Sequence, residues 1–254
     1  MRIVAIIQAR MSSTRLPGKV MADIAGKPLL ERVVRRTRQA KSASLVMVAT
    51  TDGPQDDVIE EFCEKACTAY FRGSEQDVLD RYYQSAKSVL SDAVIRITAD
   101  CPLIDPIVID TVAKIFLESN CDYASNTIEP TYPDGLDTEI FSYKALERTW
   151  KEARLRSERE HVTPYMWKHP LLFRLVNVKN NKDLSQLRWT VDTAKDLEFV
   201  RCVYKYLDML PSSGMNEVLT LLEEHPELKA LNAGFERNEG YEKSLSEDSR
   251  TCSE

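Results

Sequence analysis

The stretch from Ile3 to Lys19, IVAIIQARMSSTRLPGK, decides the fold. Its first five residues form an apolar run with the length of a strand that is buried on both faces. The loop that follows carries Arg10 and Arg15, three hydroxyl residues and a Pro-Gly-Lys turn. Such a loop is typical of phosphate binding in α/β proteins, because guanidinium donors match phosphate oxygens. The alternative is a basic surface loop after an edge strand, since neither a Walker loop nor a GxGxxG pattern is present.

The composition of the 254-residue chain favours one large α/β domain, or one domain with a small arm. A net charge of −6 argues against a nucleic-acid partner, so an anionic substrate requires a local basic site. No apolar run approaches the roughly 18 residues of a membrane helix. The start Met1-Arg2 leaves no room for a signal peptide, and six cysteines without a CxxC pair predict free thiols. These features predict a cytoplasmic protein.

The longer pattern QARMSSTRLPGKVMADIAGKPLLERVV resembles the N-terminal signature of the nucleotide-sugar cytidylyltransferases. These include CMP-Kdo and CMP-sialic acid synthetases, and the spore-coat polysaccharide biosynthesis protein F type is the most similar. The family wraps this loop around the triphosphate of CTP. The resemblance therefore implies that Arg10, Arg15 and Lys19 neutralise phosphates, that Ser13 donates a hydrogen bond and that Ala9 contacts the nucleotide.

Apolar runs and helical patterns alternate along the chain, which predicts an α/β fold with a mainly parallel sheet and helices on both faces. The resemblance sharpens this to the Rossmann-like nucleotide-diphospho-sugar transferase fold over residues 1–235. Residues 236–254 are polar and predict a disordered tail. Further strands are expected at 45–49, 68–71, 93–98, 122–125, 136–142, 172–178 and 187–191, and the main helices at 27–41, 56–66, 75–90, 106–118, 144–153, 158–168, 215–224 and 226–231.

The segment Arg72-Gly73-Ser74 reads as a tight turn before a helix, with Ser74 as a plausible N-cap. The surrounding phrase FRGSEQDVLDRYYQSA resembles the same family, in which this turn lies near the nucleotide base. The resemblance makes Arg72, Gly73 and Ser74 candidates for base contacts. Asp77 is interpreted as an acid in the first turn of the helix, where the helix dipole favours it.

Two aspartates each end a predicted strand. Asp100 follows the run at 93–98, and Asp192 follows the run at 187–191. The carboxyl ends of parallel strands share one edge, where α/β enzymes place metal ligands. The resemblance gives both aspartates to Mg²⁺, whereas Asp105 is expected to cap the next helix. Thr193 can cap the helix after Asp192, with Asp196 in the capping-box position on the helix surface. If each aspartate only caps a helix, no metal site forms.

The middle of the chain covers the sugar in related synthetases. The phrases PDGLDTEIFS and EREHVTPY resemble the family, and Asp137 and Glu139 are therefore predicted to contact a sugar. His161 is either a third sugar contact or a histidine on a helix surface. Residues 126–142 read as an exposed arm that could pair subunits of a homodimer, with a strand at 136–142 exposed on one face.

These features together predict a Mg²⁺-dependent cytidylyltransferase that joins CMP from CTP to a sialic- or Kdo-like sugar acid and releases pyrophosphate, in surface polysaccharide biosynthesis. Catalysis is assigned to Arg15, Lys19 and Asp100. One alternative is a glycosyltransferase of the same fold, although Asp100-Cys101-Pro102 is not the DxD pair that such enzymes usually carry. The other is a protein that binds nucleotide without catalysis.

Overall fold

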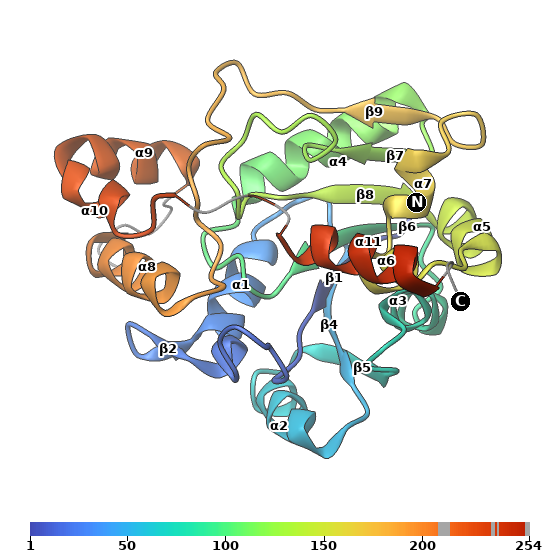
Figure 1. Cartoon of the computed structure of the whole chain (residues 1–254), viewed down its shortest axis with the longest axis horizontal. Coiled ribbons are helices and arrows are strands. Elements are labelled where there is room, and N and C mark those ends of the chain that lie inside the picture. The colour runs from blue at the N-terminus through green and yellow to red at the C-terminus, as the bar shows by residue number, and fades with distance from the viewer. Residues whose placement is uncertain (208–213, 235–236, 238, 252–254) are drawn as a thin grey trace.

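A seven-stranded sheet forms the centre of the computed structural model, which describes residues 1–207, 214–234, 237 and 239–251 (Figure 1). The strand order is β5-β4-β1-β6-β8-β7-β9. The first four of these strands are parallel, and β8 runs antiparallel to both β6 and β7. The strands are β1 (Ile3–Gln8), β4 (Leu45–Thr51), β5 (Ala69–Gly73), β6 (Ala93–Thr98), β7 (Tyr123–Ser125), β8 (Glu139–Ser142) and β9 (Leu175–Asn177), with a separate hairpin of β2 (Asp23–Ile24) and β3 (Lys27–Pro28).

Helices cover both faces of the sheet, as the sequence predicts. One apolar layer includes side chains of α1, α2, α4, α8 and α9, and the other includes side chains of α3, α5 and α7. In Figure 1, α1 and α8 lie to the left of the sheet, and α3 and α5 to the right. The helices are α1 (Leu29–Thr37), α2 (Asp57–Lys65), α3 (Val78–Ser88), α4 (Pro106–Ser119), α5 (Tyr143–Glu152), α6 (Arg156–His161), α7 (Pro164–Lys168), α8 (Ala194–Leu207), α9 (Met215–Glu224), α10 (Pro226–Ala230) and α11 (Glu239–Thr251), with 3-10 turns η1 (Lys19–Met21) and η2 (Pro54–Asp56).

Strand β1 lies between β4 and β6 and belongs to both apolar layers. Ala5 and Ile7 pack into one layer, and Val4 and Ile6 pack into the other. All four side chains are fully buried. Each buried aliphatic side chain of this size contributes about 1.5–3 kcal/mol to folding. The core therefore fixes where β1 ends and where the loop after it begins.

Two of the predicted strands differ from the structure. The strand predicted at 136–142 is not exposed on one face, because β8 is shorter and lies between β6 and β7 with Glu139, Ile140 and Phe141 buried. The segment 187–191 is not a strand, and its pairing is limited to an isolated bridge between Asp134 and Arg188. Its apolar pattern comes from burial of side chains in the core and not from a place in the sheet.

The expected arm at 126–142 is folded against the body of the protein. Asn126 Nδ2 donates to the carbonyl of Leu136 at 2.9 Å, and Asn126 Oδ1 accepts from the amide of Thr138 at 2.8 Å. Asn126, Leu136 and Thr138 are all fully buried, and Tyr132 is 6% exposed. The loop is therefore an internal part of the domain and not an exposed arm.

The tail also differs from the prediction of disorder over residues 236–254. Within the described residues, Glu239–Thr251 form helix α11, which packs on α6. Ser244 and Asp248 are buried there. Polar composition suggested disorder, but these polar side chains have partners on α6: Ser244 contacts His161, and Asp248 accepts from the amide of Ser157. Residues 236, 238 and 252–254 lie outside the described part of the chain.

Two smaller features complete the fold. Cys63, Cys67, Cys101, Cys121 and Cys202 are free thiols, as the sequence predicts. Within the described ranges, no helix combines the length and the apolar character needed to span a bilayer.

Asp105 caps two helices, which generates a first prediction. Its Oδ1 accepts from the amide of Ile107 at the start of α4, at 2.7 Å, and its Oδ2 accepts from the amide of Met215 at the start of α9, at 2.6 Å. Because Asp105→Ala removes both acceptors, we expect a loss of about 1–3 kcal/mol in the free energy of unfolding. Urea denaturation measures this change. Lys114→Ala on the exposed face of α4 is the control and is expected to cost under about 0.5 kcal/mol; equal losses would contradict the capping role.

Candidate active site

Asp56 anchors the loop that follows β1. Its Oδ1 accepts from the amide of Met11 at 2.7 Å, and its Oδ2 accepts from the hydroxyls of Thr50 and Thr51 at the end of β4. Asp56 is fully buried. The loop then closes at Gly18, whose φ of +72° suits glycine and whose amide donates to the carbonyl of Met11 at 2.9 Å. These contacts deliver the next residue, Lys19, to the carboxyl edge of the parallel strands.

The Lys19 ammonium lies between the two aspartates predicted to meet. Its Nζ donates to Asp100 Oδ2 at 2.8 Å, to Asp192 Oδ1 at 2.8 Å and to the carbonyl of Val191 at 2.9 Å. The two carboxylate oxygens therefore cannot be farther apart than twice 2.8 Å. A backbone bond from the amide of Val191 to the carbonyl of Asp100, at 2.8 Å, holds the two segments together.

The charges in this cluster stabilise each other. Burial alone lowers the pKa of Lys19, but Asp100 and Asp192 outweigh it and raise the pKa above the ordinary value. Burial raises the pKa of Asp100, but Lys19 outweighs it and brings that pKa down to about 2. Lys19 and Asp100 are consequently charged at neutral pH.

Two arginines extend the cluster. Arg15 pairs with Asp192 Oδ2 at 2.9 Å. Arg188, which the sequence reasoning missed, pairs with Asp134 at 3.1 Å, with Asp192 at 2.9 Å and with Asp196 at 3.0 Å. Asp196 is fully buried, so its predicted place on a helix surface is wrong. Its predicted capping-box contact with Thr193 is confirmed, because Asp196 accepts from the amide of Thr193 at 2.8 Å. The spacing Arg188-Asp192-Asp196, four residues apart each time, was the available sequence signal.

A pocket of about 780 Å³ opens at this edge of the sheet. Four buried polar atoms of residues that line it have no hydrogen-bond partner among the described residues: Gln8 Oε1, Arg81 Nε, Arg96 Nε and Tyr241 Oη. Buried polar atoms are almost always paired in folded proteins, and exceptions are typical of binding sites. The pocket is therefore suited to a polar ligand.

The loop residues predicted to contact nucleotide lie together in this pocket. Ala9, Arg10, Ser13, Arg15 and Lys19 all line it. The Ser13 hydroxyl also accepts from the amide of Leu16 at 3.4 Å.

The structure does not bring the segment 72–74 to the same pocket. Arg72 and Gly73 end β5, and the Arg72 guanidinium pairs with Asp57 at 2.8 Å and with Glu60. Ser74 is not the N-cap of α3; that position belongs to Asp77, which accepts from the amide of Asp80 at 2.9 Å. Ser74 accepts instead from the amide of Asp77, in the turn before the helix, because α3 begins at Val78 and not at residue 75.

Two of the three residues predicted to contact a sugar lie at the pocket, and the third does not. Asp137 and His161 line the pocket, whereas Glu139 is not among the lining residues and pairs in the interior with Arg96 at 2.8 Å. Asp137 pairs with Arg237. Burial, followed by the charge of Arg96, lowers the pKa of His161 to about 4, so the imidazole is neutral at neutral pH. His161 Nε2 contacts the hydroxyl of Ser244 on α11 at 3.1 Å, and His161 is therefore not a free surface histidine.

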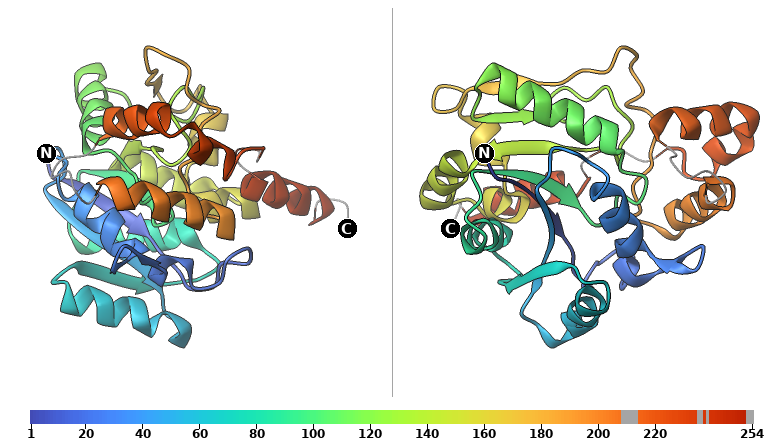
Figure 2. Two further views of the ribbon diagram at one scale, coloured as in Figure 1. Left: turned by 90° about the vertical axis from the view of Figure 1, so that its left-hand side faces the viewer. Right: turned by 180° about the vertical axis from the view of Figure 1, so that it is seen from behind.

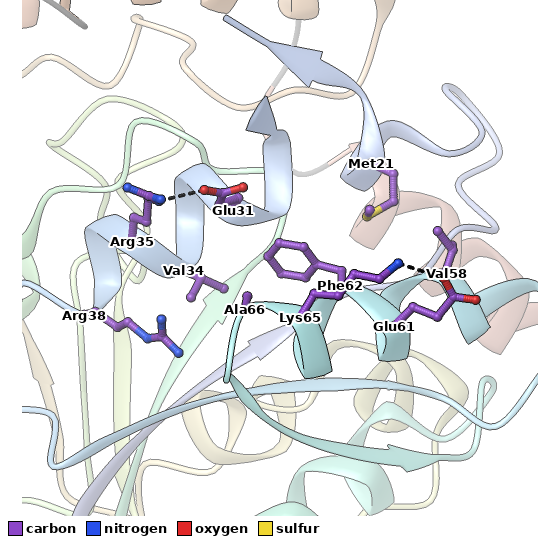
Figure 3. A pocket seen from close by; sticks show the side chains of 10 residues that line it. All are labelled: Met21, Glu31, Val34, Arg35, Arg38, Val58, Glu61, Phe62, Lys65 and Ala66. Atoms are coloured by element: carbon purple, nitrogen blue, oxygen red, sulfur yellow. Dashed lines mark hydrogen bonds and ion pairs between the residues drawn. The ribbon is translucent and has the colours of Figure 1, made fainter. Parts of the chain in front are cut away.

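A second pocket, of about 620 Å³, lies between α1 and α2 (Figure 3). Two of the charged side chains that line it have partners nearby: Arg35 pairs with Glu31 at 2.7 Å, and Lys65 pairs with Glu61 at 3.2 Å. None of the aspartates that hold Lys19 lines this pocket. The pocket at the end of β1 is therefore the stronger candidate for chemistry.

The comparisons with known proteins agree with this geometry. The sequence model described as Cytidylyltransferase matches residues 4–244. The chain belongs to the cytidylyltransferase family. It is accordingly a nucleotidyltransferase with the Rossmann-like fold that its sequence predicts.

Two relatives and one solved structure show how far the likeness extends. The spore coat polysaccharide biosynthesis protein SpsF of Bacillus subtilis is 34% identical over 232 residues, which cover 89% of this chain and 95% of SpsF. A 3-deoxy-manno-octulosonate cytidylyltransferase of Trichlorobacter lovleyi is 38% identical over 117 residues, 46% of each chain. A cytidylyltransferase structure from Leptospira borgpetersenii superposes with a TM-score of 0.88 at 32% identity and covers 93% of this chain and 100% of that one.

The Asp137 carboxyl generates a prediction about pH. Burial raises its pKa to about 7, against the opposing charge of Arg237. The ordinary value is about 3.9, so between about pH 4 and 7 the folded cytidylyltransferase holds a proton that the unfolded chain releases. The stability from this proton is fully present below about pH 4 and is lost as the pH rises through 7. Asp137→Asn, which cannot ionise, is expected to flatten this decline.

Urea unfolding of the wild type and of Asp137→Asn at intervals from pH 4 to 8 measures the effect. Asp183→Asn, at a carboxyl that is exposed and outside the pocket, is the control. Parallel stability curves for the wild type and Asp137→Asn would contradict the raised pKa.

Proposed function

We propose that this cytidylyltransferase transfers CMP from CTP to a sugar acid with release of pyrophosphate, as a Mg²⁺-dependent enzyme of surface polysaccharide biosynthesis in the cytoplasm. The observation that carries the proposal is the convergence of Lys19, Asp100 and Asp192, three residues from distant parts of the chain, at the carboxyl edge of the sheet. In α/β sheets this edge is where ligands bind.

The loop after β1 supports the nucleotide half of the proposal. Arg10, Arg15 and Lys19 bring three fixed positive charges to one side of the pocket. Such charges hold a triphosphate and stabilise the charge that develops on its oxygens during transfer. The family match and the named activity of the T. lovleyi relative support CTP and a sugar acid as substrates. Base contacts from the segment 72–74 and a homodimer stay predictions.

The donor set fits a magnesium ion that is shared with substrate. Asp100 and Asp192 already bind one cation, the Lys19 ammonium. Among the described residues, no group of three or more Cys, His, Asp or Glu is arranged to hold a metal. Mg²⁺ commonly takes one or two carboxylates and completes its shell with water and substrate phosphates, so two aspartates suffice. When bound, Mg²⁺ would neutralise phosphate charge and acidify the attacking hydroxyl.

The residues of the chain mainly position the reactants. A sugar hydroxyl attacks the α-phosphorus in line, the new oxygen–phosphorus bond forms, and the bond to pyrophosphate breaks with its electron pair on the leaving group. Arg15 and Lys19 lie where they can hold the phosphates that leave. Because catalysis of this kind is largely orientation and charge stabilisation, no nucleophile–base pair is required.

Arg15 provides a test of the phosphate site. Its guanidinium is held by Asp192 and lines the pocket. We expect Arg15→Ala to weaken CTP binding by about 1.5–3 kcal/mol, the range of a hydrogen bond to a charged group. Isothermal titration with CTP measures the change. Arg35→Ala, at the second pocket between α1 and α2, is the control and should bind CTP like the wild type. If Arg15→Ala also binds CTP with the affinity of the wild type, Arg15 is not part of the site.

The two aspartates provide the test of the function itself. Asp100→Asn and Asp192→Asn are each expected to keep the fold and to reduce turnover by orders of magnitude. The double variant should be little worse than either single variant, since both carboxylates serve one ion. The assay is pyrophosphate release with each of the four nucleoside triphosphates and a panel of 2-keto-3-deoxy sugar acids. Full activity of both single variants would contradict the shared metal site, and no release with any pair of substrates would contradict the proposed reaction.

A further inference from the structure

Helix α11 forms one wall of the active-site pocket. Six residues line the pocket from this helix: Glu239, Gly240, Tyr241, Lys243, Ser244 and Glu247. The helix crosses in front of the sheet beside α6 and projects outward from the body of the protein (Figures 1 and 2). The C-terminal segment is therefore part of the site, although its composition predicted a disordered tail.

Ion pairs fix the position of this wall at both ends. Arg237, just before α11, pairs with Asp137 and donates to the carbonyl of Tyr132 at 3.2 Å. Glu239 pairs with Arg15, and Glu247 pairs with Arg156 of α6 at 2.8 Å. Between these contacts, the hydroxyl of Ser244 meets His161. These partners bring the start of α11 close to both Arg15 and Asp137.

Lys243 has an unusual place on this helix. Its ordinary partners on a helix surface are the acids four residues away in each direction, Glu239 and Glu247. Both acids are engaged elsewhere, by Arg15 and Arg156. In the part of the chain that the structure describes, Lys243 forms no ion pair, and its side chain lines the pocket. The arrangement leaves the exposed side chain of Lys243 at the pocket without a carboxylate partner among the described residues.

We propose that Lys243 binds the carboxylate of the acceptor and makes α11 the element that selects an acidic acceptor. This inference rests on the proposed function. Among the other lining cations, Arg10, Arg15 and Lys19 belong to the loop assigned to the phosphates, and Arg96, Arg156 and Arg188 pair with carboxylates. Arg81 donates to the carbonyl of Ser74. A sugar acid brings a second anion besides the triphosphate, and Lys243, next to the Ser244 that contacts His161, offers it a cation.

The test compares an acid acceptor with its uncharged amide. We expect Lys243→Ala to raise the KM for the acid about tenfold while kcat and the KM for CTP stay within twofold. The KM for the uncharged amide should not change, so the preference for the acid over the amide should fall about tenfold as well. Lys243→Arg, which keeps the charge, should restore most of the preference. Glu242→Ala, at an exposed neighbour on α11 that does not line the pocket, is the control.

The outcomes separate this inference from the function on which it rests. A wild type that releases pyrophosphate, together with an unchanged acid preference in Lys243→Ala, contradicts the inference alone. An equal loss with acid and amide contradicts it too, because it would show a purely structural role for the helix. Calorimetric binding of the acid to wild type and Lys243→Ala gives the same comparison without turnover. A wild type that neither releases pyrophosphate nor binds any of the acids contradicts the proposed function and this inference with it.

Discussion

The contact of one ammonium with two carboxylates organises this active site. Lys19 reaches Asp100 and Asp192 at 2.8 Å each, and burial would make each charge costly if it stood alone. Lys19 comes from the turn after β1, Asp100 from the end of β6, and Asp192 from the segment before α8. Removal of Lys19 would leave Asp100 without an ion pair among the described residues, whereas Lys19 keeps one aspartate if the other is removed. The cluster therefore fastens three distant segments and also fixes the place where an anionic substrate meets a cation.

A second layer of charge holds the first in place. Arg188 binds Asp192 Oδ2, whereas Lys19 binds Oδ1. Arg188 also pairs with Asp134 and Asp196 and so links all three carboxylates. Both oxygens of Asp192 are thereby engaged, one by Lys19 and one by Arg15 and Arg188. A carboxylate with this many donors has little rotational freedom. Its oxygens are therefore held in one orientation before substrate binds, which favours catalysis. The buried network behind the pocket thus rigidifies the residues inside it.

Local sequence predicted β1, the loop after it and the position of Asp100 at the end of β6. The meeting of Asp192 with Asp100 was predicted for the wrong reason, because 187–191 is not a strand, and a backbone bond from the amide of Val191 to the carbonyl of Asp100 holds that segment in place. The rest depends on contacts between distant segments. Glu139 alternates like an exposed strand residue, but it pairs with Arg96 in the interior because β8 inserts between β6 and β7. Helix α11 reads as a polar tail until α6 is present to satisfy its side chains.

The ion pairs of Arg15 and Lys19 have a consequence for substrate binding under the proposed function. Arg15 contacts both Asp192 and Glu239, and Lys19 contacts both aspartates, so an incoming triphosphate must compete with carboxylates for the same donors. Charge balance favours a cation that enters with the nucleotide, because the aspartates released from Lys19 and Arg15 would otherwise face the phosphates directly. A magnesium–nucleotide complex, as proposed, would supply that charge. Under that proposal, Asp100 and Asp192 would exchange their ion pairs with Lys19 and Arg15 for a cation that arrives with the substrate.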